Sequence, residues 1–485
     1  MSTRVEVSNY IDGRLQAPER DAWLELYEPA TGLPCGRVAD SDTNDLEQAV
    51  AAARQAHADW SSAGAEARAG WLHTLANLVE ARAEQLAAAE SADTGKPLSL
   101  ARSVDIPRVA ANLRFFAAAA TQFASESHAM GEAAVNYTLR QPLGIVGCIS
   151  PWNLPLYLLS WKVAPALAAG NCVIAKPSEL TPVSAGLFAE LCIEAGLPPG
   201  VLNILHGRGP GIGRMITEHP AVKAVSFTGG TRTGALIAQA VAPTFRKLSL
   251  ELGGKNPSIV FADCEFERTV EGVARAAFTN QGQVCMCGSR ILVEASIYER
   301  FRDALVARVD RLKVGDPLEA DTDQGALVSS EHRSKVLEHI ALARADGGRL
   351  LCGGEAFVPP GERCRDGWFV TPTLFEGLPP GCRTNQEEIF GPVATLLPFD
   401  TEAQAVELAN GVPYGLAASI WSRDIGRCHR VAADIEAGIV WINCWMLRDL
   451  RTPLGGTKQS GVGREGGFEA MRFFTEPKNV CVSYE

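Results

Sequence analysis

The sequence predicts an α/β fold made of two successive units, each a sheet wound with helices, and a small β arm. Its 485 residues are too many for one hydrophobic core and indicate two or three domains. From Gly144 onward, short apolar runs alternate with helix signals, and this alternation resumes after Gly254. Strand–helix alternation at this spacing is typical of a doubly wound parallel sheet.

The composition is that of an ordinary globular protein. Hydrophobic residues make up 46% of the chain and charged residues 21%. The net charge of −11 argues against nucleic acid or an anionic membrane surface as the main partner. A small anionic ligand stays compatible with this charge, because local arginines would bind it.

The cysteines and the N-terminus favour a reduced, cytoplasmic protein. The 13 cysteines are odd in number and scattered, and the spacing in Cys285-Met286-Cys287 is too short for a zinc site, so we expect no metal. Met1 to Glu6 contains no apolar stretch of the kind found in a secretory signal. Three prolines interrupt the longest uncharged run, 141–161, which favours a buried strand, turn and helix over a membrane span.

In the first unit, helices precede a sheet of five short strands. Apolar residues recur at helical spacing over 45–50, 65–89 and 106–123. Thr181 followed by Pro182 predicts the start of a later helix, which Gly196 ends. Strands are expected at 144–150, 172–176, 201–205, 224–227 and 247–250.

The second unit repeats the alternation of strands and helices. Strands are expected at 259–261, 291–294, 417–421 and 439–442. Helices are expected at 267–278, 297–312, 330–345 and 425–436.

Two further segments fit neither unit. Residues 133–140 and 478–484 alternate polar and apolar side chains in the manner of exposed strands. Because an exposed strand edge tends to pair, we expect these segments to form a sheet shared between the subunits of a homodimer or homotetramer.

Two glycine-rich segments are candidates for a dinucleotide site. Residues 207–213 follow an expected strand, but Ile212 stands where the G-x-G-x-x-G pattern requires its third glycine, so a plain turn is the better interpretation. In the segment 227–234, Gly229 ends a strand and Gly234 lies one helical turn further on. This spacing would let a helix N-terminus approach a pyrophosphate closely; a structural turn is the alternative.

Cys285 and Glu251 carry the strongest chemical signal in the chain. The thiol lies in Asn280-Gln281-Gly282-Gln283-Val284-Cys285, and the glutamate lies 34 residues earlier in Glu251-Leu252-Gly253-Gly254-Lys255. Neither motif supplies the nearby base that a cysteine protease needs. A thiol paired with a distant carboxylate predicts covalent catalysis, with the carboxylate activating water in a later step.

Together these segments resemble the active site of the NAD(P)-dependent aldehyde dehydrogenase superfamily. The resemblance covers nearly the whole chain and rests further on Pro151-Trp152-Asn153, on Lys-Pro-Ser-Glu at 176–179 and on Glu-Ile-Phe-Gly-Pro at 388–392. The domains that it implies are a doubly wound NAD-binding domain at 1–125 and 143–252, an α/β catalytic domain at 253–455, and a β oligomerisation arm at 126–142 and 470–485.

The resemblance also implies a role for each motif residue. Cys285 would attack the aldehyde carbon, Asn153 would hold the oxyanion, and Glu251 would activate the water that hydrolyses the thioester. NAD would be the coenzyme, because Glu179 would bind the ribose hydroxyls and repel a 2′-phosphate. The expected coenzyme contacts are Ser150, Trp152, Lys176, Glu179, Gly229, Gly234, Glu388 and Phe390.

Each motif residue also has an ordinary structural explanation. Asn153 could cap a helix, Lys176 could lie in solvent, and Glu251 could be a surface carboxylate.

Two other classes of protein are alternatives, namely a thiol esterase without redox chemistry and a non-catalytic protein that kept the fold. The coenzyme motifs argue against the first, and the intact set of Cys285, Glu251 and Asn153 argues against the second.

Two arginines indicate the substrate. Arg448 lies in a segment that lines the aldehyde tunnel in this family, and Arg114 lies on a helix that can line its mouth. They are similar to the pair in the branch that oxidises muconic semialdehydes, whose carboxylate two guanidiniums would bind. The alternative is that Arg448 pairs with Asp449 at the surface and that Arg114 is solvated.

The expected substrate is therefore 2-aminomuconate 6-semialdehyde, oxidised to 2-aminomuconate. Arg114, with Phe115 and Phe116 beside it, favours the 2-amino compound over 2-hydroxymuconic semialdehyde. A general aldehyde dehydrogenase, similar to those acting on betaine aldehyde, is the third alternative.

Overall fold

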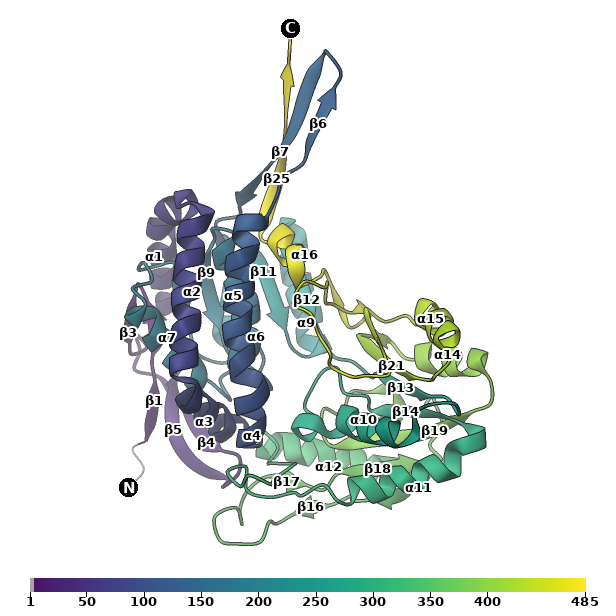
Figure 1. The fold of residues 1–485 in the computed structure, drawn as a ribbon. Coiled ribbons are helices and arrows are strands. Elements are labelled where there is room, and N and C mark those ends of the chain that lie inside the picture. The colour runs from purple at the N-terminus through teal and green to yellow at the C-terminus, as the bar shows by residue number, and fades with distance from the viewer. Residues whose placement is uncertain (1–3) are drawn as a thin grey trace.

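The computed structural model describes residues 4–485, and they form two units built on large sheets, with a three-stranded arm that projects from the first (Figure 1). Residues 1–3 lie outside the described residues. They belong to the predicted N-terminal domain and to the segment Met1 to Glu6, in which no secretory signal is expected. The predicted α/β class, with two wound sheets and a β arm, is confirmed.

The first unit is built on an eight-stranded sheet. Its strands in spatial order are β24 (Gly461–Val462), β12 (Lys247–Glu251), β11 (Val222–Thr228), β8 (Ile145–Ile149), β9 (Cys172–Lys176), β10 (Leu202–Ile204), β2 (Asn9–Ile11) and β3 (Arg14–Gln16). β12, β11, β8, β9 and β10 are parallel to one another, and the strand order reverses between β8 and β11. In a doubly wound sheet, ligands bind outside the carboxyl ends of the strands at this reversal.

Helices flank this sheet, and one of them is buried along nearly its whole length. α6 (Pro155–Ala168) packs on β8 and β9, and α2 and α5 pack on α6 in turn (Figure 1). This burial explains why the run 141–161 lacks charges. No helix within residues 4–485 is long and apolar enough to cross a membrane. The other helices of the unit are α1 (Thr43–Ser62), α2 (Ala65–Ala81), α3 (Ala83–Thr94), α5 (Ile106–Gln122), α7 (Val183–Glu194), α8 (Arg214–Glu218) and α9 (Thr231–Val241).

The N-terminal region departs from the helical prediction. A separate sheet contains β1 (Val5–Val7), β5 (Leu33–Ala39) and β4 (Trp23–Glu28), and β2 and β3 extend the large sheet. The predicted helix 65–89 is divided at Arg82, whose φ of −105° and ψ of 18° leave the helical range. Thr181 does not cap α7, because its hydroxyl donates to the Trp152 carbonyl instead.

The second unit is a seven-stranded sheet covered on both faces. Its order is β15 (Arg349–Cys352), β18 (Thr373–Glu376), β19 (Val393–Phe399), β14 (Arg290–Glu294), β13 (Pro257–Val260), β21 (Ala417–Trp421) and β22 (Ile439–Ile442). Successive side chains of β14 point to opposite faces: Ile291 and Val293 pack with α10 (Phe266–Phe278) and α11 (Tyr298–Val309), whereas Leu292 packs with α14 (Glu402–Asn410) and α15 (Ile425–Asp434).

One further long helix, α12 (Ser330–Ala345), and several shorter elements lie beside or between these layers. The shorter elements include α4 (Leu98–Leu100), α13 (Arg383–Gln386), the π-helical turns η1 (Ala101–Asp105) and η2 (Gly209–Gly213), the 3₁₀ turns η3 (Ala242–Thr244), η4 (Thr279–Gly282) and η5 (Ala295–Ile297), and the strand pairs β16 (Ala356–Phe357) with β17 (Phe369–Val370) and β20 (Tyr414–Gly415) with β23 (Thr457–Lys458).

The projecting arm joins the two segments that fitted neither unit. β7 (Ala134–Pro142) pairs antiparallel with β6 (Ser127–Met130) and with β25 (Thr475–Ser483), so residues far apart in the chain lie side by side (Figure 1). The C-terminal strand is shorter than the predicted 470–485, because α16 (Gly467–Phe473) precedes it. Met471 and Phe474 are buried in the first core and hold this segment against the body.

Candidate active site

Four residues singled out in the sequence lie where parallel strands of the first sheet end. Ser150 follows β8, Lys176 ends β9, Gly229 follows β11, and Glu251 ends β12. Backbone hydrogen bonds join neighbouring strand ends: Ser150 N donates to Lys176 O at 3.0 Å, and Gly229 N donates to Glu251 O at 3.0 Å. The topology therefore gathers these residues along one edge of the sheet, on both sides of the strand-order reversal.

Lys176 and Glu179 form a partly buried ionic contact at this edge. Lys176 Nζ donates to Glu179 Oε2 at 3.0 Å and its side chain is only 3% exposed, so the lysine does not lie in solvent. The backbone N–H of Gly209 donates to the other oxygen of Glu179 at 3.2 Å. Burial tends to raise the pKa of Glu179, but Lys176 and the backbone N–H groups outweigh it and hold the pKa below its usual value.

The glycines before and inside α9 permit close packing. A Cβ on Gly234 would lie 2.5 Å from Leu252 Cδ2, and a Cβ on Gly229 would lie 2.4 Å from Cζ of Phe227. Gly230 lies between them, and a Cβ added to it would have no neighbouring atom within 4 Å. The hydroxyl of Thr228 and that of Ser150 are buried without a hydrogen-bond partner. The edge thus offers an uncrowded helix N-terminus and two unused hydroxyls to a phosphate or sugar.

A cavity of about 220 Å³ reaches from this edge to the thiol. Trp152 forms part of its wall: its ring meets those of His332 and Phe390 edge to face, each at a centroid distance of 5.2 Å. The lining residues are Pro151, Trp152, Asn153, Leu158, Thr228, Gly229, Gly230, Leu252, Gly253, Cys285, His332, Lys335, Glu388 and Phe390.

His332 and Lys335, in the first turns of α12, line the cavity but were not predicted from the sequence as site residues. The helix itself was predicted, but nothing in its local pattern indicates that this end faces the cavity. His332 Nε2 donates to the Phe390 carbonyl at 2.7 Å, and burial lowers the pKa of His332 to about 4, so its ring is neutral. Across the cavity, Glu388 accepts a hydrogen bond from Gly254 N at 3.0 Å, and burial raises the pKa of Glu388 to about 7.

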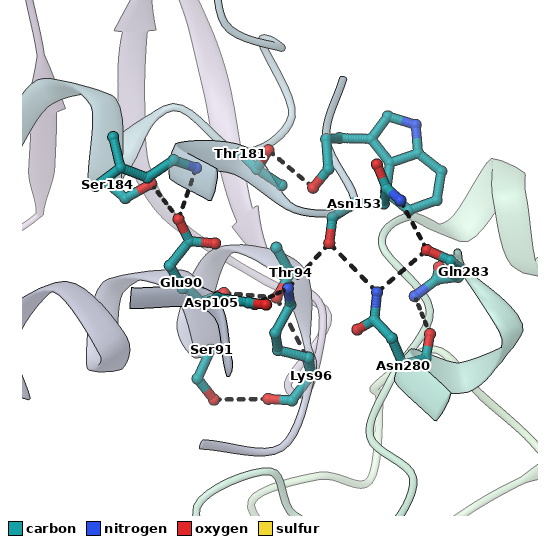
Figure 2. Close-up of polar contacts among 12 residues, drawn as sticks. Glu90, Ser91, Thr94, Lys96, Asp105, Asn153, Thr181, Ser184, Asn280 and Gln283 are labelled. Carbon is teal, nitrogen blue, oxygen red and sulfur yellow. Dashed lines mark hydrogen bonds and ion pairs between the residues drawn. The ribbon is translucent and has the colours of Figure 1, made fainter. Parts of the chain in front are cut away.

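Asn153 and the cysteine loop are joined by hydrogen bonds, although they belong to different units. Asn153 Nδ2 donates to Gln283 O at 2.9 Å, and Asn280 Nδ2 donates both to Gln283 O at 3.2 Å and to Asn153 O at 3.3 Å (Figure 2). Asn280 and Gln281 have φ values of 54° and 55°, a left-handed conformation that only strong surrounding contacts maintain.

Asn256 fixes the other side of the cysteine loop. Its Nδ2 donates to the carbonyls of Cys285 at 2.8 Å and of Cys287 at 2.9 Å. Because Asn256 lies five residues after Glu251, the glutamate segment and the thiol segment are connected directly. Cys285 lines the cavity, whereas Cys287 is buried in a hydrophobic cluster and does not line it.

The thiol and the carboxylate share an electrostatic environment. The pKa of Cys285 is raised to about 12, mainly by burial and also by the charges of Glu388 and Glu251, while the charge of Arg448 lowers it. Burial also raises the pKa of Glu251 well above its ordinary value, with a contribution from Glu465. Glu251 Oε1 is buried without a hydrogen-bond partner, so it is free to accept a proton or to bind water.

The structure brings Arg448 to the site but places Arg114 elsewhere. Arg448 Nη1 donates to the Tyr157 hydroxyl at 3.0 Å, and Asp449 pairs with Arg451 rather than with Arg448. Arg114 donates to Asn77 Oδ1 at 2.8 Å and pairs with Glu80, both on α2.

A different arginine of α5, Arg108, approaches the same tyrosine as Arg448. The Arg108 guanidinium lies 5.7 Å from the centroid of the Tyr157 ring, and that of Arg448 lies 5.3 Å from the Trp161 ring. Six residues, or about one and two-thirds helical turns, separate Arg108 from Arg114, so their side chains leave α5 on different faces. The Arg114 side chain thus lies against α2, and Arg108 is the arginine of α5 that lies over the Tyr157 ring.

A thiol, an amide and a carboxylate beside the carboxyl edge of a doubly wound sheet are a set of groups that suits covalent catalysis by the thiol. The aldehyde dehydrogenase family profile matches residues 16–480. The chain is 47% identical to 2-aminomuconic semialdehyde dehydrogenase of Danio rerio, over 99% of this chain and 98% of that one. It is 46% identical to 2-hydroxymuconic semialdehyde dehydrogenase of Pseudomonas sp. (strain CF600), over 98% and 99%.

A solved structure agrees with these matches. The NAD+ complex of an aldehyde dehydrogenase from Bacillus cereus superposes with a TM-score of 0.96 at 38% identity, covering 99% of this chain and 97% of that one. The chain therefore belongs to the aldehyde dehydrogenase family, and it is an enzyme that oxidises aldehydes. The family and fold predicted from the sequence are confirmed.

Replacing Glu251 by glutamine should separate the two halves of turnover. The amide cannot take a proton from water, so thioester hydrolysis should slow by roughly 10²-fold or more while the first hydride transfer persists. Stopped-flow absorbance should then show a burst of NADH of about one equivalent per site. Because the pKa of Glu251 is raised, the wild-type hydrolysis rate should increase as the pH rises through that pKa, and the variant should lose this limb. Loss of the burst together with turnover would mean that Glu251 acts before hydride transfer.

Proposed function

We propose that this enzyme uses NAD to oxidise an aldehyde that carries a carboxylate at its far end, with a muconic semialdehyde as the substrate. The observation that carries the proposal is the convergence of Arg448 and Arg108 on Tyr157, beside the thiol site. The names of the two relatives support it, since both proteins act on muconic semialdehydes.

In the proposed mechanism Cys285 attacks the aldehyde carbon as a thiolate. The pKa of this thiol is raised to about 12, mainly by burial, so the thiol must lose its proton before the attack. The amide of Asn153 donates a hydrogen bond to the oxyanion that forms. NAD, when bound, supplies the hydride acceptor. Glu251 then takes a proton from the water that hydrolyses the thioester, and the carboxylate product leaves.

The residues at the sheet edge fit a dinucleotide. The free hydroxyls of Ser150 and Thr228 and the open space at Gly230 suit its phosphates and ribose. Glu179 would hold the adenosine ribose beside Lys176, Glu388 would hold the nicotinamide ribose, and the rings of Trp152 and Phe390 would pack along the coenzyme. Gly229 and Gly234 act by permitting this close packing.

The two arginines form an electropositive end to the substrate site, which we call the arginine pair (Arg108 and Arg448). Within the described part of the chain, no carboxylate lies in ion-pairing contact with either guanidinium. Both are placed by rings of α6, Tyr157 and Trp161, which fix their direction. A carboxylate that enters here gains charge-assisted hydrogen bonds without having to displace an internal partner.

The arginine pair also separates the alternatives. A betaine aldehyde carries a quaternary cation, which two guanidiniums would repel. The 2-amino and 2-hydroxy semialdehydes carry the same carboxylate, so both remain candidates. The preference for the 2-amino compound, which rested on Arg114 with Phe115 and Phe116, loses that basis, because Arg114 is paired on α2 and Phe116 is packed against Trp161.

We propose further that the enzyme is a cytoplasmic homo-oligomer. The arm formed by β6, β7 and β25 leaves a long edge and exposed apolar side chains such as Met130, Tyr137 and Val482 in this chain. Such an edge favours pairing with another subunit of a homodimer or homotetramer. The division into an NAD-binding domain, a catalytic domain and this arm is part of the same proposal.

Arg448→Ala and Arg108→Ala should each weaken the use of a muconic semialdehyde. The loss of hydrogen bonds to a charged group, about 1.5–3 kcal/mol, corresponds to a fall of roughly 10- to 150-fold in kcat/KM, mostly through KM. A neutral aliphatic aldehyde of similar length should be used as before. Steady-state kinetics with the two substrates measure this difference.

Arg114→Ala is the matched control, because it removes an arginine from the same helix. Its guanidinium contacts Glu80 and Asn77, so kcat/KM for both aldehydes should stay within about twofold. Equal losses for the charged and the neutral aldehyde in Arg448→Ala would exclude binding of the substrate carboxylate at this place.

Replacing Glu179 should change the choice of coenzyme. Its ionised carboxylate would repel the 2′-phosphate of NADP, so the wild-type enzyme should prefer NAD, and Glu179→Gln should raise kcat/KM for NADP while lowering that for NAD. Initial rates with both coenzymes at a fixed aldehyde concentration measure the ratio. A wild-type enzyme that is more efficient with NADP would overturn this account of Glu179.

A further inference from the structure

A buried ion pair lies directly behind Asn153. Lys96 and Asp105 pair with each other, and neither side chain has any solvent exposure. Lys96 Nζ also donates to the backbone carbonyl of Asn153 at 2.9 Å (Figure 2). Lys96 follows the end of α3 and Asp105 ends η1, so the ammonium group connects three separate segments of the first unit.

The backbone carbonyl of Asn153 is held from both units. On one side is the ammonium of Lys96, and on the other is Asn280 Nδ2, whose donor atom lies 3.3 Å away. The side chain of the same residue extends towards the cysteine loop, where Nδ2 donates to Gln283 O. Fixing the carbonyl therefore fixes the peptide plane from which the Asn153 side chain starts, and with it the direction of the amide.

Stability alone does not account for a charged pair at this place. Replacing a buried ion pair with apolar side chains of similar volume is often neutral or stabilising, because both charges lose their hydration on folding. The surroundings add to that cost: Glu90, a third charged residue, is fully buried nearby, and burial raises its pKa to about 7 while Lys96 opposes the shift. Glu90 is itself held by Leu156 N and the Ser184 hydroxyl, each at 2.8 Å.

We propose that Lys96, held by Asp105, is a positioning residue for oxyanion stabilisation. It acts through the Asn153 carbonyl and aims the amide at the oxygen of the aldehyde. This inference rests on the oxyanion role proposed above for Asn153. Lys96 does not line the cavity, and Asn153 is the one lining residue of the described chain with which it forms a hydrogen bond, so its loss should affect the chemical step and leave the binding of NAD unchanged.

The test compares Lys96→Met, the repaired pair Lys96→Met with Asp105→Leu, and Asn153→Ala alone and combined with each. Single-turnover NADH formation reports the chemical step, the thermal midpoint reports stability, and fluorescence titration reports NAD affinity. Lys96→Met leaves Asp105 buried without a partner and should lower the midpoint, whereas the repaired pair should recover it. If Lys96→Met does not fold, the repaired pair carries the test.

The positioning role predicts that the repaired pair regains stability but not rate. Removing an oxyanion donor outright lowers kcat by roughly 10²- to 10³-fold, so a misdirected donor should lower the single-turnover rate by about tenfold or more. In the Asn153→Ala background the same replacement should change the rate by less than about twofold, because the group through which Lys96 acts is gone. NAD affinity should not change.

Arg246→Met is the matched control. Arg246 also holds backbone carbonyls with a cationic side chain, namely those of Thr217, His219 and Val222, but it lies before β12 at the other end of the strand from Glu251. This variant should lower the thermal midpoint and leave the single-turnover rate unchanged.

Two results would overturn the inference: a repaired pair with the full wild-type rate, or a rate loss that is the same with and without Asn153. A different failure would concern Asn153 itself. If Asn153→Ala kept the wild-type rate, the oxyanion role proposed above would be wrong, whatever Lys96 does.

Discussion

The hydrogen bonds between Asn153 and the cysteine loop are the contact on which the rest of the site depends. Asn153 follows a strand of the first sheet and Cys285 precedes a strand of the second, so neither unit contains both this amide and the thiol. The distance between the two segments is set by the hydrogen bond from Asn153 Nδ2 to Gln283 O, at 2.9 Å, and by the bridging amide of Asn280. A small shift between the two units would misplace the amide relative to the reacting carbon, and such a misplacement would lower the rate strongly.

Burial is the second constraint, and it acts on the thiol and on two carboxylates of the site. It raises the pKa of Cys285 to about 12 and that of Glu388 to about 7, and it raises that of Glu251 well above its ordinary value. A buried carboxylate of raised pKa is a better base towards water at neutral pH, whereas a buried thiol is harder to ionise. The positive charge of Arg448 only partly opposes the shift at the thiol, and its role in the proposed function is to bind the substrate carboxylate.

The sequence predicted what local pattern determines. Strand–helix alternation predicted both sheets, and the motifs around Glu251 and Cys285 predicted the chemistry. The sequence did not predict contacts between distant segments. Strands β1 to β5 form only by pairing with one another or with β10. His332 reaches the cavity because α12 lies there. The same limit explains why the sequence indicated Arg114 rather than Arg108. The period of a helix alone does not show which of its faces meets α6. The buried pair behind Asn153 left no local signal at all.

A crystal structure of Cys285→Ala with NAD and a muconic semialdehyde tests the central claim most directly. That claim is that the substrate lies with its aldehyde at Asn153 and its carboxylate at the arginine pair. The predicted result is a carboxylate within about 3 Å of both guanidiniums and an aldehyde oxygen within about 3 Å of Asn153 Nδ2. A carboxylate bound at Lys335 or in solvent, with Arg108 and Arg448 making no contact, would contradict it.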